Sequence, residues 1–337
     1  MNRLLLPTVA LLAVALLVGC EESPTEIDQE TTPVMKKGGN KPGGGGGAPA
    51  DPAIAYQANG ALRVMNVDGS NSTIVVPDGE FYAWPSWAPF GAGTRGEPYR
   101  IVYQAGSCGL ATVNVFVEDG SILGDLPSPI GTGCGGSTPA WSPDGAWIAY
   151  ATDSYLLGVI EAGTQPPSAT ILYSGPSAGA VAMPSWSPDG DAIAFLEFDF
   201  EQGSSTIKVY HLADGVDTPI IAHADLPGVL EIRYGPDWSR SDTHHKLAFT
   251  ASRLVRVGKK PGPAKMVYGV YTIALQHDAS TGHYSAEGPA TYEIDGSQPS
   301  WSPDDSQLAM DGITVFDIAT SGGTTSLARG TMADWKR

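Results

Sequence analysis

Short apolar segments recur along this chain with the spacing of β-strands joined by turns, and no long amphipathic helix pattern follows the first twenty residues. Six segments share a triplet in which Ile or Leu precedes a small or branched residue and then an aromatic residue or Met. They are Ile54-Ala55-Tyr56, Ile101-Val102-Tyr103, Ile148-Ala149-Tyr150, Ile193-Ala194-Phe195, Leu247-Ala248-Phe249 and Leu308-Ala309-Met310. This recurrence indicates one repeated structural unit, and a repeat determines the architecture.

A second recurring segment ends in tryptophan and leads into a turn. Its clearest copies are PAWSPDG (139–145), PSWSPDG (184–190) and PSWSPDD (299–305); weaker copies are PSWAPF (85–90), PDWSRS (236–241) and MADWKR (332–337). Ser-Pro-Asp-Gly is turn chemistry, since Pro presets φ, Asp bonds nearby backbone and Gly accepts a positive φ. We expect the repeated rings to pack between neighbouring units, each burying on the order of 200 Å². These rings belong to Trp87, Trp141, Trp186, Trp238, Trp301 and Trp335.

The triplets and the tryptophan segments are out of phase at the two ends of the repeat region. The first triplet has no tryptophan segment before it, and the last tryptophan segment, around Trp335, has no triplet after it. A ring satisfies both ends if the C-terminal strand pairs with the N-terminal strands, and closure removes exposed sheet edges. We therefore predict an all-β fold, a six-bladed β-propeller with four-stranded blades.

The WSPDG-x-x-IAF pattern resembles the repeat of the TolB-like propellers, which are relatives of the WD-repeat propellers. The resemblance covers residues 51–337. It implies a propeller that serves as a binding platform, as part of a protein complex or as a domain of an enzyme, so it specifies the fold more closely than the function. The chain shows no α/β domain ahead of the repeats, unlike TolB, so a role as the Tol component is not expected.

The N-terminal region reads as a targeting segment and a tether. Residues 1–19 have one early positive charge, an apolar run and the ending Leu17-Val18-Gly19 before Cys20, which resembles the bacterial lipobox. The resemblance implies a lipoprotein signal peptide and acyl chains on Cys20, which would anchor the protein. Residues 20–50 are charged and glycine-rich and cannot bury a core, so we predict a disordered tether. We expect a lipid-anchored protein of the cell envelope, on the outer membrane at its periplasmic or surface face.

Two cysteines remain after Cys20. An even pair in an exported protein indicates a disulfide, and Cys108 and Cys134 are expected on the same face of one blade. The alternative is two free thiols.

Charge singles out one loop. The formal net charge is −17, which argues against nucleic acid as a partner. Five basic residues nevertheless gather between 253 and 265, and a salt-sensitive contact with an acidic protein, lipid headgroup or glycan would use them. The alternative is a solvated hairpin tip. The five residues are Arg253, Arg256, Lys259, Lys260 and Lys265.

The histidines show no metal-ligand spacing. We expect them in solvated loops, with the adjacent His244 and His245 on opposite sides of a strand, and we predict no metal and no cofactor. The six histidines are His211, His223, His244, His245, His277 and His283.

Together these features predict a monomeric, non-enzymatic, lipid-anchored propeller that binds an envelope protein or a glycan ligand. The alternative is an enzyme, lyase-like and carbohydrate-active, that uses the central channel. We favour binding because the sequence shows no catalytic cluster at equivalent blade positions and no hydrolase domain after the propeller.

Overall fold

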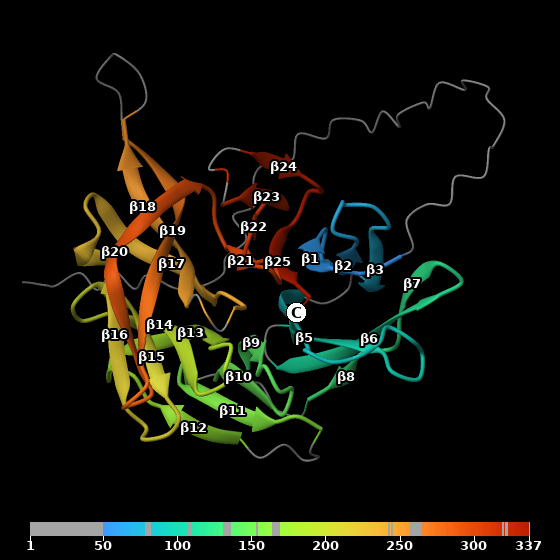
Figure 1. Ribbon diagram of the computed structural model, residues 1–337, viewed down its shortest axis with the longest axis horizontal. Helices are drawn as coiled ribbons and strands as arrows, with labels where there is room; N and C mark the ends of the chain where they lie inside the picture. The colour runs from blue at the N-terminus through green and yellow to red at the C-terminus, as the bar shows by residue number, and fades with distance from the viewer. Residues whose placement is uncertain are drawn as a thin grey trace, which may run out of the picture. The chain divides into compact units, whose positions relative to one another are not determined.

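The structure is a computed structural model, and it describes residues 50–77, 82–106, 109–130, 136–152, 154–163, 169–241, 243, 245–256, 264–318, 320 and 323–336. These residues form six antiparallel sheets around one axis and a single 3₁₀ turn, η1 (His223–Asp225) (Figure 1). The predicted all-β, six-bladed propeller is confirmed. The predicted signal peptide and nearly all of the predicted tether lie outside the described residues. Within the described residues, no helix has the length and apolar character needed to cross a membrane.

The blades are numbered here in chain order, with strands given from the inner to the outer edge. Blade 1 has β25 (Thr331–Trp335), β1 (Ile54–Ala58), β2 (Ala61–Met65) and β3 (Thr73–Val76). Blade 2 has β4 (Tyr82–Trp87), β5 (Tyr99–Ala105), β6 (Leu110–Glu118) and β7 (Ser121–Gly124), and the short β8 (Ser128–Pro129) also pairs with β6. Blade 3 has β9 (Ser137–Trp141), β10 (Trp147–Ala151), β11 (Leu157–Glu161) and β12 (Ala169–Tyr173). Blade 4 has β13 (Gly179–Trp186), β14 (Ala192–Asp199), β15 (Ser204–His211) and β16 (Asp217–Ala222). Blade 5 has β17 (Val229–Trp238), β18 (Lys246–Val255), β19 (Lys265–Asp278) and β20 (His283–Asp295), and blade 6 has β21 (Ser300–Trp301), β22 (Gln307–Met310), β23 (Thr314–Asp317) and β24 (Thr324–Ser326).

Blade 1 joins the two ends of the repeat region. The C-terminal strand β25 pairs antiparallel with β1, so that Trp335 lies opposite Ile54 and Asp334 opposite Ala55 (Figure 1). The ring therefore closes through main-chain hydrogen bonds between the first and last strands. The predicted closure by the C-terminal strand is confirmed, and its physical basis is that β25 covers the edge of β1 that would otherwise be unpaired.

All six units share one strand register. In every blade the tryptophan that ends the inner strand lies opposite the first residue of the apolar triplet in the next strand. The pairs are Trp335 with Ile54, Trp87 with Ile101, Trp141 with Ile148, Trp186 with Ile193, Trp238 with Leu247 and Trp301 with Leu308. The repeat in sequence is thus a repeat of pairing geometry.

The apolar core consists of six clusters that join neighbouring blades. Each cluster contains one repeat tryptophan together with side chains of the preceding blade. Trp87 of blade 2, for example, lies with Leu62 and Val64 of blade 1. All six rings are buried. Burial of this kind favours packed blades over separate sheets, because a single sheet cannot cover both of its faces.

The Ser-Pro-Asp-Gly turns are held by side-chain hydrogen bonds. In blade 3, Ser142 Oγ donates to Asp144 Oδ1 at 2.6 Å and accepts from Trp147 N at 2.9 Å. The turn Gly145 has φ of +70°, which glycine adopts without strain. Blade 6 places Asp305 at that position with φ of +56°, so a carboxylate stands there at some conformational cost.

Candidate functional site

The inner strands bend at equivalent points where the chain approaches the axis. The residue before the repeat Pro, or before Ala333 in blade 1, has a positive φ in all six blades, and five of these strands show a register shift there. The residues are Trp84, Thr138, Met183, Gly235, Gln298 and Met332. A residue before proline normally prefers extended backbone, and a left-handed conformation costs a non-glycine residue about 1–3 kcal/mol. Because the positive φ recurs at the same position of all six blades, it belongs to the repeat that brings the chain to the axis.

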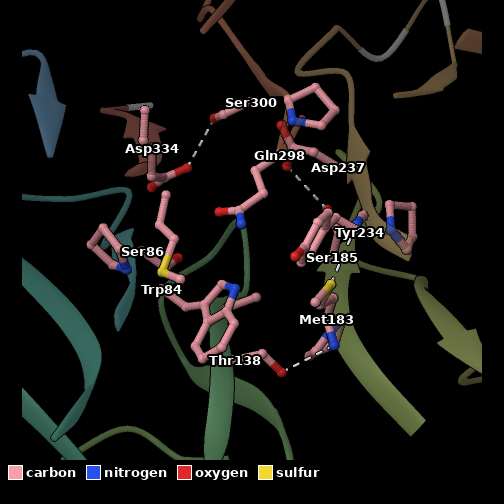
Figure 2. Close-up of a pocket in the computed structure, with 18 of the residues that line it drawn as sticks. Trp84, Ser86, Thr138, Met183, Ser185, Tyr234, Asp237, Gln298, Ser300 and Asp334 are labelled. Atoms are coloured by element: carbon pink, nitrogen blue, oxygen red, sulfur yellow. Dashed lines mark hydrogen bonds between the residues drawn. The ribbon is translucent and has the colours of Figure 1, made fainter. Parts of the chain in front are cut away.

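The bends surround a cavity on the ring axis. Its volume is about 110 Å³, and residues from the inner segments of all six blades line it (Figure 2). Trp84, Met183, Gln298 and Tyr234 are among the side chains around it (Figure 2). The side chains that precede the repeat tryptophans also line it, and they are Ser86, Ala140, Ser185, Asp237, Ser300 and Asp334.

Five of the six side chains that precede the repeat tryptophans join neighbouring blades through hydrogen bonds. Each accepts a hydrogen bond from the main-chain N–H of the tryptophan in the following blade. The bonds are Trp141 N to Ser86 Oγ (3.2 Å), Trp238 N to Ser185 Oγ (2.9 Å), Trp301 N to Asp237 Oδ2 (2.7 Å), Trp335 N to Ser300 Oγ (3.4 Å) and Trp87 N to Asp334 Oδ2 (2.9 Å). Ala140 occupies the sixth position and has no side-chain acceptor.

Adding a sixth hydrogen bond of this kind is expected to stabilise the ring. Ala140→Ser supplies an acceptor for Trp186 N in the position that Ser185 uses for Trp238 N, and the side chain faces an existing cavity. We expect the free energy of unfolding to rise by about 0.5–1.5 kcal/mol, the usual net value of one hydrogen bond. Urea unfolding followed by tryptophan fluorescence measures this difference. Ala140→Val is the control, and an equal or larger gain for valine would contradict the hydrogen-bond explanation.

An arginine closes one end of this cavity. Arg240 Nη2 lies 3.3 Å from Asp237 Oδ2 and 3.5 Å from Asp334 Oδ1, and Nη1 donates to Trp238 O at 3.1 Å. The Arg240 side chain is 9% exposed and the two aspartates are each 17% exposed. Asp305 holds the main chain in place, because its two oxygens accept from Arg240 N (2.6 Å) and Ser241 N (2.7 Å). We name Arg240, Asp237 and Asp334 the axial ion cluster.

Beyond Arg240 a second axial cavity opens toward the turns. It has a volume of about 260 Å³ and is bordered by the turn prolines of four blades, together with Trp186, Ser239 and Arg240. The prolines are Pro89, Pro143, Pro188 and Pro303. The turns of these four blades therefore gather on one face of the ring. Arg240 borders both cavities and therefore lies between them.

Sequence reasoning missed the axial ion cluster. Its signal lay in the copies that depart from the repeat: PDWSRS has Asp237 in place of Ser and Arg240 in place of Pro, and MADWKR has Asp334 in place of Ser. A charged residue at a position that faces the ring axis has to meet a charge of opposite sign. The deviations from the repeat therefore marked the ionic contacts, whereas the repeat itself marked the packing.

The sites predicted from sequence lie away from this axis or outside the described residues. Cys20, Cys108, Cys134, Lys259 and Lys260 are among the residues that the structure does not describe. The segments beside the two later cysteines are adjacent, since Ile130 N donates to Leu110 O at 2.8 Å. The described basic residues of the loop line neither axial cavity.

The described basic residues of the predicted loop differ in their surroundings. Arg253 Nη2 binds Asp295 Oδ1 at 2.8 Å, and its guanidinium lies 4.4 Å from the centre of the Tyr292 ring. This pairing raises the pKa of Arg253. Lys265 and Arg256 are exposed at the ends of β19 and β18. Arg253 thus serves the sheet of blade 5, which leaves the exposed pair as the described part of any contact surface.

The histidine prediction is wrong for His211. His211 is only 1% exposed, and its ring stacks on the ring of His283 with the two ring centroids 4.2 Å apart. His277 stacks on Tyr284 at 4.6 Å, and His245 meets the same ring edge-on at 5.0 Å. His245 also precedes β18 rather than lying within it. The turns of blade 4 and the hairpins of blade 5 bring these side chains together across a blade boundary, which local sequence does not reveal.

The buried histidine is expected to make stability depend on pH. Burial lowers the pKa of His211, and the neighbouring His283 lowers it further. The unfolded chain then binds more protons than the folded chain, so the free energy of unfolding decreases as pH falls below the unfolded histidine value of about 6.5. We expect denaturant unfolding to show lower stability at pH 5.5 than at pH 7.5, with a smaller difference in His211→Gln. The same difference in both proteins would show that His211 is not the source.

Metal ligation receives no support from the described residues, among which no group of three or more His, Cys, Asp or Glu side chains is arranged to hold an ion.

Comparison with known proteins identifies the fold. No protein-family model and no curated protein matches the chain. Among solved structures, a candidate TolB from Agrobacterium tumefaciens has a TM-score of 0.51 and 15% identity, covering 82% of this chain and 88% of its own. An oligogalacturonate lyase in complex with manganese has a TM-score of 0.41 and 13% identity, covering 84% and 85%. The periplasmic gluconolactonase of Pseudomonas aeruginosa has a TM-score of 0.43 and 12% identity, covering 85% and 99%.

The first of these structures confirms the predicted likeness to TolB in fold. The prediction that the protein is not an enzyme is corrected. It rested on the absence of a catalytic cluster at equivalent blade positions and of a hydrolase domain, yet the solved structures that match the chain include the lyase, the gluconolactonase and a candidate 6-phosphogluconolactonase from Bacteroides uniformis. The fold is therefore compatible with binding and with catalysis, because function resides in the site and not in the fold.

Proposed function

We propose that this protein is a binding platform of the bacterial cell envelope, which receives a segment of a partner protein or a glycan ligand in the proline-bordered cavity on its axis. The observation that carries the proposal is the cavity itself. Four equivalent prolines surround about 260 Å³ of space, and a side chain fixed by two carboxylates forms its floor. A rim of prolines loses little conformational entropy when a ligand binds, which favours affinity.

Site-specific photo-crosslinking tests this proposal. A photoreactive residue at Pro143 places the probe in the axial rim, and the same residue at the exposed Ser326 on β24 is the control. In intact envelopes we expect an adduct of defined mass at Pro143, none at Ser326, and loss of the Pro143 adduct when Pro188→Glu puts a charge on the rim. No adduct at Pro143, or equal adducts at both positions, would contradict an axial binding site.

The basic hairpin is proposed as a second contact for the same partner. Arg256 and Lys265 are exposed where β18 ends and β19 begins, on a chain of strongly acidic composition. Such a local charge contrast favours an acidic surface. A third crosslinking probe, at Arg256, is expected to give an adduct that disappears at high salt, since screening weakens exposed charge contacts. An adduct insensitive to salt would argue against this contact.

The envelope location rests on the N-terminal sequence. The apolar run followed by Cys20 resembles a lipobox, and the glycine-rich segment to residue 50 suits a tether. We propose that acyl chains on Cys20 anchor the protein to the membrane. Cys20→Ser is expected to move the protein from the membrane pellet to the soluble fraction, while Cys108→Ser leaves it in the pellet. Retention of the Cys20 variant in the membrane pellet would disprove lipid anchoring at this residue.

A further inference from the structure

A third cavity lies away from the axis, between blades 3 and 4. Its volume is about 480 Å³, within the range of sites that hold one small molecule. The turn between β9 and β10 borders it on one side, and the turn between β13 and β14 on the other. We name this cavity the blade 3–4 groove.

The groove combines an aromatic and aliphatic wall with carboxylates. Trp147 is 38% exposed and lines the groove together with Leu172 and Leu212. Asp144, Asp189 and Asp191 also line it, and no Lys or Arg is among its described lining residues.

The carboxylates differ in how far the fold uses them. Asp189 Oδ1 accepts from Ser187 Oγ and Oδ2 from Tyr284 OH, so both of its oxygens are engaged. Asp144 uses Oδ1 to hold its turn, and this hydrogen bonding lowers the pKa of Asp144, which keeps it ionised at neutral pH. Asp191 contributes its main-chain N–H to Asp189 Oδ1, and the residue is exposed at the groove. Asp144 and Asp191 are therefore the carboxylates best placed to contact a ligand directly, while the Asp189 carboxylate adds to the negative charge of the groove.

The protein contains a second groove of the same construction, between blades 5 and 6. That groove is bordered by Ser239, Ser241, Trp301, Asp304, Asp305 and Lys246. Lys246 and Trp147 occupy equivalent positions, because each begins the second strand of its blade and directly precedes the apolar triplet. The blade 5–6 groove therefore has a lysine among its lining residues together with two aspartates. The blade 3–4 groove has the Trp147 indole at that position, so a cation that balances its aspartates has to be supplied by a ligand.

We propose that the blade 3–4 groove binds a small aliphatic diamine. One ammonium group meets Asp144 and Asp191, the methylene chain lies along Leu172, and the second ammonium group lies over the face of the Trp147 ring, which attracts a cation. This site is separate from the axial cavities and does not depend on their proposed function. A neutral sugar, which aromatic side chains also accommodate, is the competing ligand in the test.

Isothermal titration of 1,5-diaminopentane into the full chain, at pH 7 and low ionic strength, tests the proposal. We expect saturable one-to-one binding that weakens as salt is added. Asp191→Asn and Trp147→Ala should each weaken binding by about two- to fivefold, the usual worth of an exposed ion pair or cation–π contact. Trp147→Lys should abolish binding, because it places in this groove the cation that Lys246 provides in the other.

Matched controls make the result decisive. Asp119→Asn removes one exposed charge from the β6–β7 turn, away from the groove lining, and should bind the diamine like the native protein. Trp147→Ala introduces the residue type that blade 4 already has at the equivalent position, Ala192. Absence of saturable diamine binding to the native protein would overturn the proposal. Equal binding by all the variants, or saturable binding of glucose in place of the diamine, would overturn it as well.

Discussion

Arg240→Leu is expected to lower the free energy of unfolding by about 3–5 kcal/mol, the usual cost of leaving a buried charge without its partner. The substitution keeps an apolar stem but removes the guanidinium that lies between Asp237 and Asp334. Both carboxylates then face the axis with no cation between them. Urea unfolding at pH 7 measures the loss.

The cause is separable from lost packing by a second substitution and by a surface control. If charge is responsible, the deficit of Arg240→Leu should shrink when Asp237→Asn removes one of the two carboxylate charges that Arg240 contacts. Arg95 forms an ion pair with Glu118 at 2.8 Å, with side chains 61% and 49% exposed. Arg95→Leu should cost less than about 1 kcal/mol, as surface pairs do. Equal losses for the two arginines would mean that the axial ion cluster contributes no more than a surface pair.

Trp335→Ala is expected to cost about 3–5 kcal/mol, the usual range for removing a buried aromatic side chain. The Trp335 ring is buried against Ala309, Ile313 and Val315 of blade 6, while its main chain pairs with Ile54 of blade 1. The residue therefore packs on the last blade and closes the first. Because the ring closes only here, we also expect the variant to unfold less cooperatively, seen as a lower denaturant m-value.

Trp147→Ala is the matched control for this prediction. Trp147 is the same residue type on the same fold, but it borders a groove and is partly exposed. Its replacement should lower the free energy of unfolding by less than Trp335→Ala does, since 38% of the Trp147 surface is already exposed to solvent. If both alanine variants unfold at the same urea concentration, closure at Trp335 does not determine the stability of the ring.

The regular part of the repeat is the part that local sequence predicted well. The six triplets and six tryptophans implied a closed ring, and the register of each pair follows from their spacing. Such inference works because each blade meets the same two physical requirements. The first is a flat aromatic ring that packs against the neighbouring blade, and the second is a turn that reverses the chain. The Ser142 and Asp144 side chains meet the second requirement within six residues of sequence.

The candidate sites depended on contacts between distant segments. Arg240 and Asp334 are 94 residues apart, and His211 and His283 lie on different blades. Neither pair has a local pattern that would reveal it. The interpretation of His211 as a solvated loop residue failed for the same reason, since its burial is supplied by the neighbouring blade.

The amino-acid sequence by itself determined the architecture of this protein: strand period, turn chemistry and a repeated tryptophan are local properties, and a ring is the arrangement that satisfies all copies at once. Only the tertiary structure decided which charges meet on the axis and which groove lacks a cation. The physical reason is that a hydrophobic pattern needs only the correct face of a strand. An ionic contact or a binding cavity needs side chains from separate blades at distances that closure of the ring alone brings about.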